Sequence, residues 1–195
     1  MDIGRVDAEG ADRHHKARVQ EAAMNGRVEA IHITQAAGAP MEALEAVEAL
    51  VGGGLAGDRY LLGTGFYSAQ PRADGGRELT LIEVEVLEAL AAEHGIRLTA
   101  ADSRRNLTTR GLRLPELIGR RFTVGAIVCE GVDHCPPCQH LVNVTGRPLL
   151  APLVGRSGIR ARIVIGGWLR VGDAITVVDG DEPLGATDSS VALRV

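Results

Sequence analysis

Several stretches of this chain alternate hydrophobic and polar residues with a period close to two, the pattern of a strand with one buried face. Residues 26–34, GRVEAIHIT, combine this pattern with β-branched residues, and Leu79 and Leu81 fit a strand in the middle of the chain. Residues 104–132 and 157–180 contain further β-branched runs, which glycines interrupt at intervals of about eight to twelve residues. This spacing is typical of a β-sandwich or a β-barrel.

Three other stretches place hydrophobic residues at helical spacing. Residues 41–50, MEALEAVEAL, do so directly behind Pro40, a residue that favours the start of a helix, and they predict a short helix. Residues 84–94 predict a second helix that ends at Gly95, and residues 139–146, QHLVNVTG, predict a third. Because these helices lie singly between strands, without regular βαβ alternation, we expect a mainly β fold: an antiparallel β-barrel with a few short α-helices packed around it.

The length of the chain favours one domain. Its 195 residues are 45% hydrophobic, which is enough for one good core. We expect this domain to span residues 26–178. Residues 1–25 carry nine charged side chains and no sustained apolar stripe, which predicts a flexible leader or a short helix. Residues 179–195 are expected to form a polar C-terminal tail.

Composition and charge argue against some classes of partner. The formal net charge is −4, the pI is near 5.9 and only 3% of the residues are aromatic, whereas nucleic-acid binders usually carry a basic excess and stacking side chains. No stretch approaches the roughly 18 consecutive apolar residues of a membrane span, and the N-terminus lacks the apolar core of a signal peptide. We therefore expect a cytoplasmic protein that binds neither nucleic acid nor membrane, and in which the three cysteines are free thiols, catalytic groups or ligands.

Residues 133–141, DHCPPCQHL, concentrate the candidate chemistry. Cys135 and Cys138 have the spacing of a dithiol redox pair, but a thioredoxin-like site needs a βαβ frame near the start of the chain. A zinc site is a second interpretation, and its possible ligands would be Cys129, His134, Cys135, Cys138 and His140. These ligands form one compact group, whereas structural zinc commonly uses two separated pairs, and Cys129 in the apolar run TVGAIVC is expected to be buried and inert.

In a third interpretation of this motif, Cys138 alone is the working group. It follows two prolines and precedes the predicted helix over residues 139–146, so its sulfur would lie at a helix N-terminus, where its pKa would be lowered. A thiolate at this position could attack a sulfur donor or bind a soft metal. The fourth interpretation is purely structural, with both cysteines packed in a turn.

A second cluster, SRRNLTTRG, is basic and contains Arg104, Arg105, Asn106 and Arg110. Guanidinium groups suit bidentate binding of phosphate, and an asparagine adds a donor and an acceptor. A solvated surface run is the alternative, since charged side chains mostly face water. The stretch GLAGDRY raises the same choice for Asp58, which either helps to form an anion-facing loop or closes a tight corner by a hydrogen bond to the backbone.

Taken in order, these segments resemble the MOSC domain, the family named for the C-terminal module of molybdenum cofactor sulfurase. The resemblance spans about residues 26–178 and implies a β-rich, barrel-like fold. It rests on GGGLAGDRY (52–60), RELTLIEVEVLEAL (77–90), RRNLTTRGLRLPELIGRRFTVG (104–125), CPPCQHL (135–141), GRPLLAPLVGRSGIRARIVIGG (146–167) and LRVGD (169–173).

The resemblance also implies roles for individual residues. The family's shared cysteine falls on Cys138, and its R-R-N and G-D-R motifs fall on Arg104, Arg105, Asn106, Gly57, Asp58 and Arg59. In amidoxime-reducing and hydroxylaminopurine-reducing relatives, the cysteine binds molybdenum and basic residues hold the pterin phosphate. The chain would then bind a molybdenum-pterin cofactor and reduce N-hydroxylated compounds with electrons from a separate reductase.

The sulfurase-linked view of the family implies a different function. Cys138 would carry sulfur as a persulfide for metal-sulfur cofactor assembly and would receive it from a separate cysteine desulfurase that holds pyridoxal phosphate. Cys135, which the family pattern does not demand, could resolve such a persulfide as an intramolecular disulfide.

Overall fold

The computed structural model describes residues 25–70 and 72–178. The leader expected over residues 1–25 and the tail expected over residues 179–195 lie, apart from Asn25, outside the described residues.

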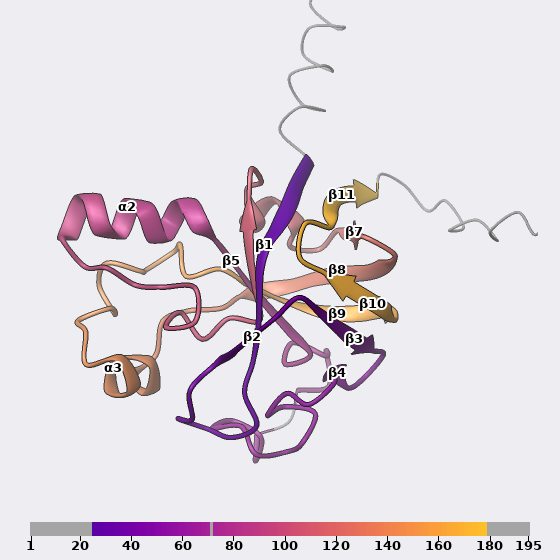
Figure 1. Cartoon of the computed structure of the whole chain (residues 1–195), viewed down its shortest axis with the longest axis horizontal. Helices are drawn as coiled ribbons and strands as arrows, with labels where there is room; N and C mark the ends of the chain where they lie inside the picture. The colour runs from indigo at the N-terminus through magenta and orange to yellow at the C-terminus, as the bar shows by residue number, and fades with distance from the viewer. Residues whose placement is uncertain (1–24, 71, 179–195) are drawn as a thin grey trace, which may run out of the picture.

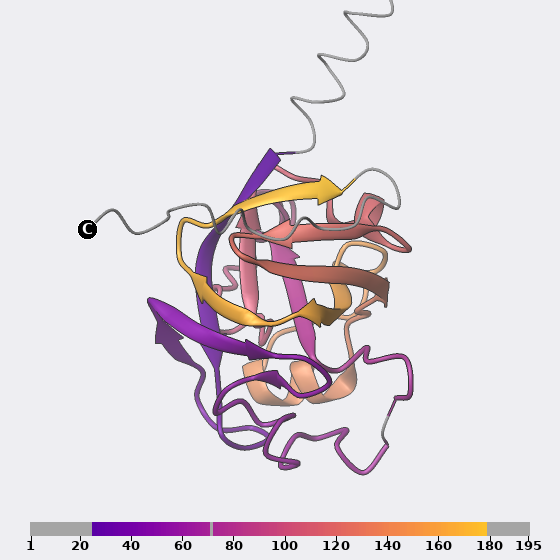
Figure 2. The same cartoon turned by 90° about the vertical axis from the view of Figure 1, so that its right-hand side faces the viewer.

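Seven strands close into a β-barrel (Figures 1 and 2). Around the barrel they run β11 (Ala174–Val178), β7 (Arg121–Val124), β8 (Ile127–His134), β9 (Ile159–Ile165), β5 (Leu79–Glu83), β6 (Leu107–Arg110) and β1 (Asn25–Ile33), and β1 pairs back onto β11. Each neighbouring pair is antiparallel except β5 and β6, which are parallel. This arrangement confirms the β-barrel that the strand spacing predicted.

The helix predicted over residues 41–50 is wrong, because this stretch forms two strands. Strand β2 (Glu42–Leu44) extends the barrel sheet beside β1, and β3 (Ala46–Leu50) lies between β10 (Gly167–Arg170) and β4 (Gly54–Leu55) in a small second sheet. Along β3 the buried residues Val47 and Ala49 alternate with exposed Glu48, a period of two. Pairing with β10 and burial of one face therefore outweigh the helix propensity of this Ala- and Glu-rich stretch.

The described part of the chain contains two α-helices, and both were predicted. Helix α2 (Val84–His94) ends at Gly95, which adopts a left-handed φ of 66° and donates its backbone N–H to Ala91 and Leu90. Helix α3 (Gln139–Thr145) follows the two cysteines, and a short 3₁₀ helix, η1, spans Leu114–Leu117. Figure 1 shows α2 and α3 on the same side of the barrel. No helix in residues 25–70 and 72–178 is long and apolar enough to cross a membrane.

Two hydrophobic clusters stabilise this arrangement. The first fills the barrel and includes Phe122 and Cys129, neither of which has any exposed surface. Burial raises the pKa of the Cys129 thiol to about 12, so Cys129 is buried and inert, as the sequence predicted. The second cluster lies between β5 and the helices, and Leu141 of α3 belongs to it while Cys138 packs against it. This packing fixes the position of the cysteine loop.

Candidate functional site

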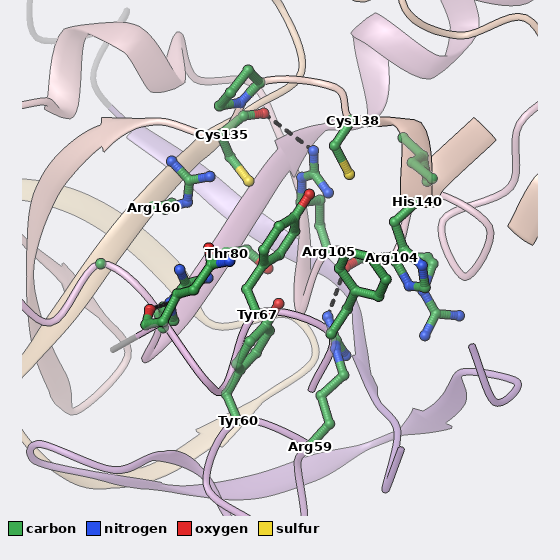
Figure 3. A pocket seen from close by; sticks show the side chains of 16 residues that line it. Arg59, Tyr60, Tyr67, Thr80, Arg104, Arg105, Cys135, Cys138, His140 and Arg160 are labelled. Carbon is green, nitrogen blue, oxygen red and sulfur yellow. Dashed lines mark hydrogen bonds between the residues drawn. The ribbon is translucent and has the colours of Figure 1, made fainter. Parts of the chain in front are cut away.

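A cavity of about 290 Å³ lies beside the first residues of β5 and β9 (Figure 3). Residues from three further parts of the chain complete its walls: the segment 59–77, the pair Arg104 and Arg105 ahead of β6, and the loop 135–141 that leads into α3. Among the described residues, the walls contain five arginines and no aspartate or glutamate. On a chain with a net charge of −4, the cavity is therefore a local cationic site.

Both thiols of the C-P-P-C motif belong to this cavity, and both are free. Cys138 is the N-cap residue of α3 and is partly exposed, whereas Cys135 is buried and donates its backbone N–H to the carbonyl of Gly158 at 2.9 Å. Figure 3 shows the two sulfur atoms directed into the cavity, toward Tyr67. The pKa of Tyr67 is raised, first by burial and then by the nearby Cys138 thiol. The reactive-thiol interpretation therefore fits this geometry.

The zinc and thioredoxin interpretations do not fit the structure. Within residues 25–70 and 72–178, no group of three or more histidine, cysteine, aspartate or glutamate side chains is placed to hold a metal ion. Cys129 is enclosed in the barrel core, and His134 is exposed at the end of β8. The cysteines also follow a barrel strand, outside the βαβ frame that a thioredoxin-like site requires.

Arg104 has two unusual features. Its φ of 59° makes it the one non-glycine residue with a left-handed backbone in the described ranges, a conformation that costs of order 1–3 kcal/mol and tends to occur at functional sites. Its side chain is buried, and although Nη1 donates to the carbonyl of Ala39 at 2.9 Å, Nη2 has no partner among the described residues. Burial, followed by the charge of Arg59, lowers the pKa of Arg104. The site thus presents a buried, unpaired donor suited to an anion.

Asp58 closes a tight corner by a hydrogen bond to the backbone, one of the two alternatives considered for it, and it also orients Arg59. Its Oδ2 accepts the backbone N–H of Tyr60 at 3.1 Å, while its Oδ1 accepts a hydrogen bond from Arg59 Nη1 at 3.2 Å. Nη2 of Arg59 donates to the carbonyl of Arg104 at 3.2 Å. Gly57 precedes this turn with a φ of 77° and does not line the cavity. The G-D-R stretch therefore holds Arg59 against Arg104.

Arg105 lines the cavity, but most of its donors already bind protein atoms. Nε donates to the carbonyl of Ser157 at 3.1 Å, and Nη2 donates to Ser157 Oγ at 2.8 Å and to the carbonyl of Cys135 at 3.1 Å. Nη1 donates to the carbonyl of Ser103 at 3.3 Å. Arg105 therefore ties the cysteine loop to the segments that precede β6 and β9.

Asn106 and Arg110, the remaining members of the predicted basic cluster, do not line the cavity. The Asn106 side chain is buried; its Oδ1 accepts from Thr80 Oγ1 at 2.8 Å and its Nδ2 donates to Asp58 Oδ1 at 3.3 Å. Arg110 pairs with Glu88 at 2.7 Å, away from the site. The surface-run alternative thus fits Arg110 but is wrong for the buried Arg104, Arg105 and Asn106.

The aromatic wall of the cavity was not predicted from the sequence. The rings of Phe66 and His140 stack at a centroid distance of 4.2 Å, and Phe66 meets Tyr67 edge to face at 4.9 Å. Burial, followed by the charges of Arg104 and Arg59, lowers the pKa of His140. The chain has only two tyrosines and two phenylalanines. Three of these four residues lie within residues 60–67, and this clustering is a signal that could have identified the wall.

Two more arginines, neither of them predicted from the sequence, complete the site. Arg77 lies 5.3 Å from the centroid of the Tyr67 ring and 5.9 Å from that of the Tyr60 ring, both within cation–π range. Arg160, on β9, donates from Nη1 to Asp133 Oδ2 at 3.2 Å. The cavity can therefore bind anionic groups next to a free thiol.

Comparisons with known proteins support these assignments at the level of the family and the fold. The MOSC domain family model matches residues 56–176. No curated protein matches the chain. Among solved structures, the YuaD protein from Bacillus subtilis superimposes with a TM-score of 0.66 at 19% sequence identity, over 79% of this chain and 96% of that one.

Two further structures have the same fold. YiiM from Geobacillus stearothermophilus gives a TM-score of 0.60 at 16% identity, with 79% of this chain and 75% of that chain covered. YiiM from Escherichia coli gives a TM-score of 0.57 at 18% identity, with 79% and 70% covered. Sequence identities this low support a shared fold and leave function to be argued from the site.

Proposed function

Because the chain belongs to the MOSC domain family, we propose that its arginine-lined cavity binds a molybdenum-pterin cofactor, with Cys138 as the protein ligand of the metal. The observation that carries this proposal is the combination, in one cavity, of a free thiol and a buried guanidinium nitrogen that has no partner in the described part of the chain.

The phosphate of the cofactor would bind at Arg104. A buried donor without a partner is costly, and a phosphate oxygen would satisfy Nη2 with a charge-assisted hydrogen bond. Arg59 lies against Arg104, and its positive charge would add to the attraction. Arg105 would act indirectly, because its hydrogen bond to the Cys135 carbonyl holds the cysteine loop in position.

Cys138 would provide a soft thiolate ligand for the metal. Helix α3 and the second core cluster hold this residue at the cavity, which is the preorganisation that a ligand requires. The raised pKa of Tyr67 keeps its hydroxyl protonated at neutral pH, so the hydroxyl can donate a hydrogen bond to the sulfur. When bound, the cofactor would supply electron-transfer chemistry that no side chain in the cavity provides.

We expect the loaded protein to reduce N-hydroxylated small molecules. In this proposal the cavity would hold the cofactor and the substrate, and the electrons would come from a separate reductase. The aromatic wall formed by Tyr60, Phe66, Tyr67 and His140 would receive the flat part of such a substrate by stacking.

A sulfur carrier is the alternative function, and the second thiol favours it. Cys135 lines the same cavity as Cys138, so a persulfide on Cys138, delivered by a separate pyridoxal-phosphate-dependent desulfurase, would have a thiol partner nearby. A carrier does not need a cationic cavity, however, whereas a cofactor with a phosphate group needs arginines such as Arg59 and Arg104 to bind it. The charge of the cavity therefore favours the cofactor.

Molybdenum and zinc analysis of protein expressed in a host that makes the pterin cofactor tests this proposal. We expect molybdenum close to one atom per chain, its loss in Cys138→Ala, and a fall of at least tenfold in retained pterin in Arg104→Gln. Arg110→Gln removes an arginine outside the cavity and is the matched control, so it should retain the cofactor.

Protein free of molybdenum in this host, with cyanide-releasable sulfur that depends on Cys138, would overturn the proposal in favour of the carrier. Thermal unfolding of each variant would show whether a loss of cofactor reflects loss of fold. A stably folded Arg104→Gln that retained all its pterin would contradict the assignment of the phosphate to Arg104.

A further inference from the structure

We infer that the cavity contains a second anion-binding subsite, formed by Arg77 and Arg160, which receives an acidic group of the substrate. The substrate class is then N-hydroxylated compounds that also carry a carboxylate or phosphate. This inference rests on the proposed function, since it takes Arg104 to be occupied by the cofactor phosphate.

The guanidinium groups of Arg77 and Arg160 have donors to spare. Arg77 donates from Nε to the carbonyl of Gln70 at 2.9 Å, and its two Nη atoms have no hydrogen-bond partner in residues 25–70 and 72–178. Arg160 uses Nη1 for Asp133 and for the carbonyl of His134, at 2.8 Å, and leaves Nε and Nη2 without a partner in the same part of the chain. By contrast, Arg105 bonds protein atoms through all three of its nitrogens.

The second subsite is separate from the proposed phosphate position. Figure 3 shows Arg160 beside Cys135 and Arg104 near His140, on opposite sides of the Tyr67 ring. Arg77 lies over this ring, and the Tyr67 hydroxyl faces Cys138. An acidic group bound by Arg160 and Arg77 would therefore place the rest of the molecule along Tyr67, toward the Cys138 sulfur.

The charge of the cavity also calls for a second anion. Five guanidinium groups line it, and the adjacent Asp58 together with a phosphate dianion would offset three of their charges. Asp133 contributes little more, because it is shared with Arg72, at 2.9 Å, and is itself 39% exposed. Uncompensated charge in a partly buried cavity is unfavourable, so binding an anion there stabilises the site and binding a cation does not.

Two substrates with the same reacting group test the inference. Benzamidoxime is neutral, and 4-carboxybenzamidoxime adds one carboxylate. For the molybdenum-loaded protein with a reduced dye as electron donor, we expect kcat/KM to be at least tenfold higher for the acid, with the difference mainly in KM. In the double variant Arg77→Gln, Arg160→Gln this ratio should fall toward one, while Arg77→Lys, Arg160→Lys should keep part of it because the charges remain.

Arg162→Gln is the matched control. Arg162 lies two residues beyond Arg160 on β9, pairs with Glu130 at 2.9 Å and does not line the cavity, so the ratio should stay as in the wild type. Because each ratio compares two substrates on the same protein, a general loss of folded or loaded enzyme does not change it. Equal kcat/KM values in the wild type, or a preference that survives in the double Gln variant, would overturn the inference.

Calorimetry without an electron donor provides a readout independent of turnover. In full-length protein from a host that lacks the cofactor, inorganic phosphate should bind at two positions. Arg104→Gln should remove one of these positions, and the double variant Arg77→Gln, Arg160→Gln should remove the other. If phosphate binds at a single position and only Arg104→Gln removes it, the second subsite is overturned. Protein that never acquires molybdenum but shows both phosphate positions would overturn the proposed function and retain the subsite.

Discussion

The imidazole of His140 reports on whether the cavity holds an anion. Burial and the charges of Arg104 and Arg59 lower its pKa from the usual 6.5. An anion at Arg104 would offset these charges, so saturating phosphate should raise the His140 pKa, as should Arg104→Gln. Titration of the His140 ring signal by NMR, in the wild type and in Arg104→Gln, measures both effects. An unchanged His140 pKa at saturating phosphate would contradict the position assigned to the anion.

The lowered pKa of His140 affects the pH dependence of both phosphate binding and folding stability. Binding is reciprocal, so if an anion raises the pKa of His140, phosphate affinity must increase as the pH falls through that pKa. Because its pKa is lowered in the folded state, the His140 imidazole binds a proton less readily there than in the unfolded chain. The stability contributed by His140 is therefore present above 6.5 and is lost as the pH falls toward the lowered pKa.

At the scale of residues, the sequence identified groups whose chemistry is visible locally. Cys138 stands out through its motif, and Arg104 through its neighbours in R-R-N. Arg77 and Arg160 could not be identified in this way, because each is one arginine in an ordinary turn or strand pattern. Arg77 and Arg160 reach one cavity only in the folded chain. Strand pairing places Arg160 of β9 beside Thr80 of β5, and the path of residues 59–77 brings Arg77 to the same place.

At the scale of elements, Gly158 is the residue that lets β9 approach β5. Its φ is +89°, and a Cβ at this position would overlap the carbonyl oxygen of Leu81 on β5. Its own carbonyl accepts the N–H of Cys135 at 2.9 Å. Gly158→Ala should therefore lower the free energy of unfolding by about 3 kcal/mol or more, through backbone strain and overlap together.

Gly155→Ala is the matched control for this prediction. Gly155 also has a positive φ, +73°, but a Cβ there meets nothing within 4 Å. Gly155→Ala should lower the free energy of unfolding by about 1 kcal/mol, because of the left-handed backbone alone. Urea denaturation of both variants gives the two free energies. If both variants lower the free energy of unfolding by the same amount, the overlap with Leu81 at Gly158 does not contribute to the loss.

The sequence predicted elements correctly where local pattern and tertiary burial agree. Helix α2 has an apolar face and a glycine stop, and both the helix and its end at Gly95 were found. Residues 41–50 offered helical spacing, but their partner β10 begins at residue 167, more than a hundred positions away. A short window contains no information about that partner, so propensity gave the wrong element there.

At the scale of the whole molecule, the barrel class was predictable and its closure was not. Regular spacing of short strands indicated a barrel, but the pairing that closes it joins β1 to β11, nearly the whole described chain apart. The parallel pairing of β5 with β6 also depends on the path through α2. Similarly, the net charge of −4 gave no indication of a cationic cavity, because that cavity exists only after these strands have met.

This closure predicts how the molecule unfolds. Leu169 of β10 and Val47 of β3 belong to the same core cluster as Ile175 of β11, so the small sheet has no separate core. We expect the barrel and the small sheet to open together. In hydrogen exchange measured by mass spectrometry, the slowest amides of β10 and of β8 should give the same opening free energy.

Removing core volume from the closing strand tests this cooperativity. Ile175 has no exposed surface, so Ile175→Ala should lower the opening free energies of β10 and β8 equally, by about 2–5 kcal/mol. Thr176→Ala, one residue along β11 on its exposed side, should change both by no more than about 0.5 kcal/mol. If Ile175→Ala lowered the value for β8 and left that for β10 unchanged, the small sheet would fold on its own. The β3–β4 segment, which leads into Asp58 and Arg59, would then be anchored independently of the barrel.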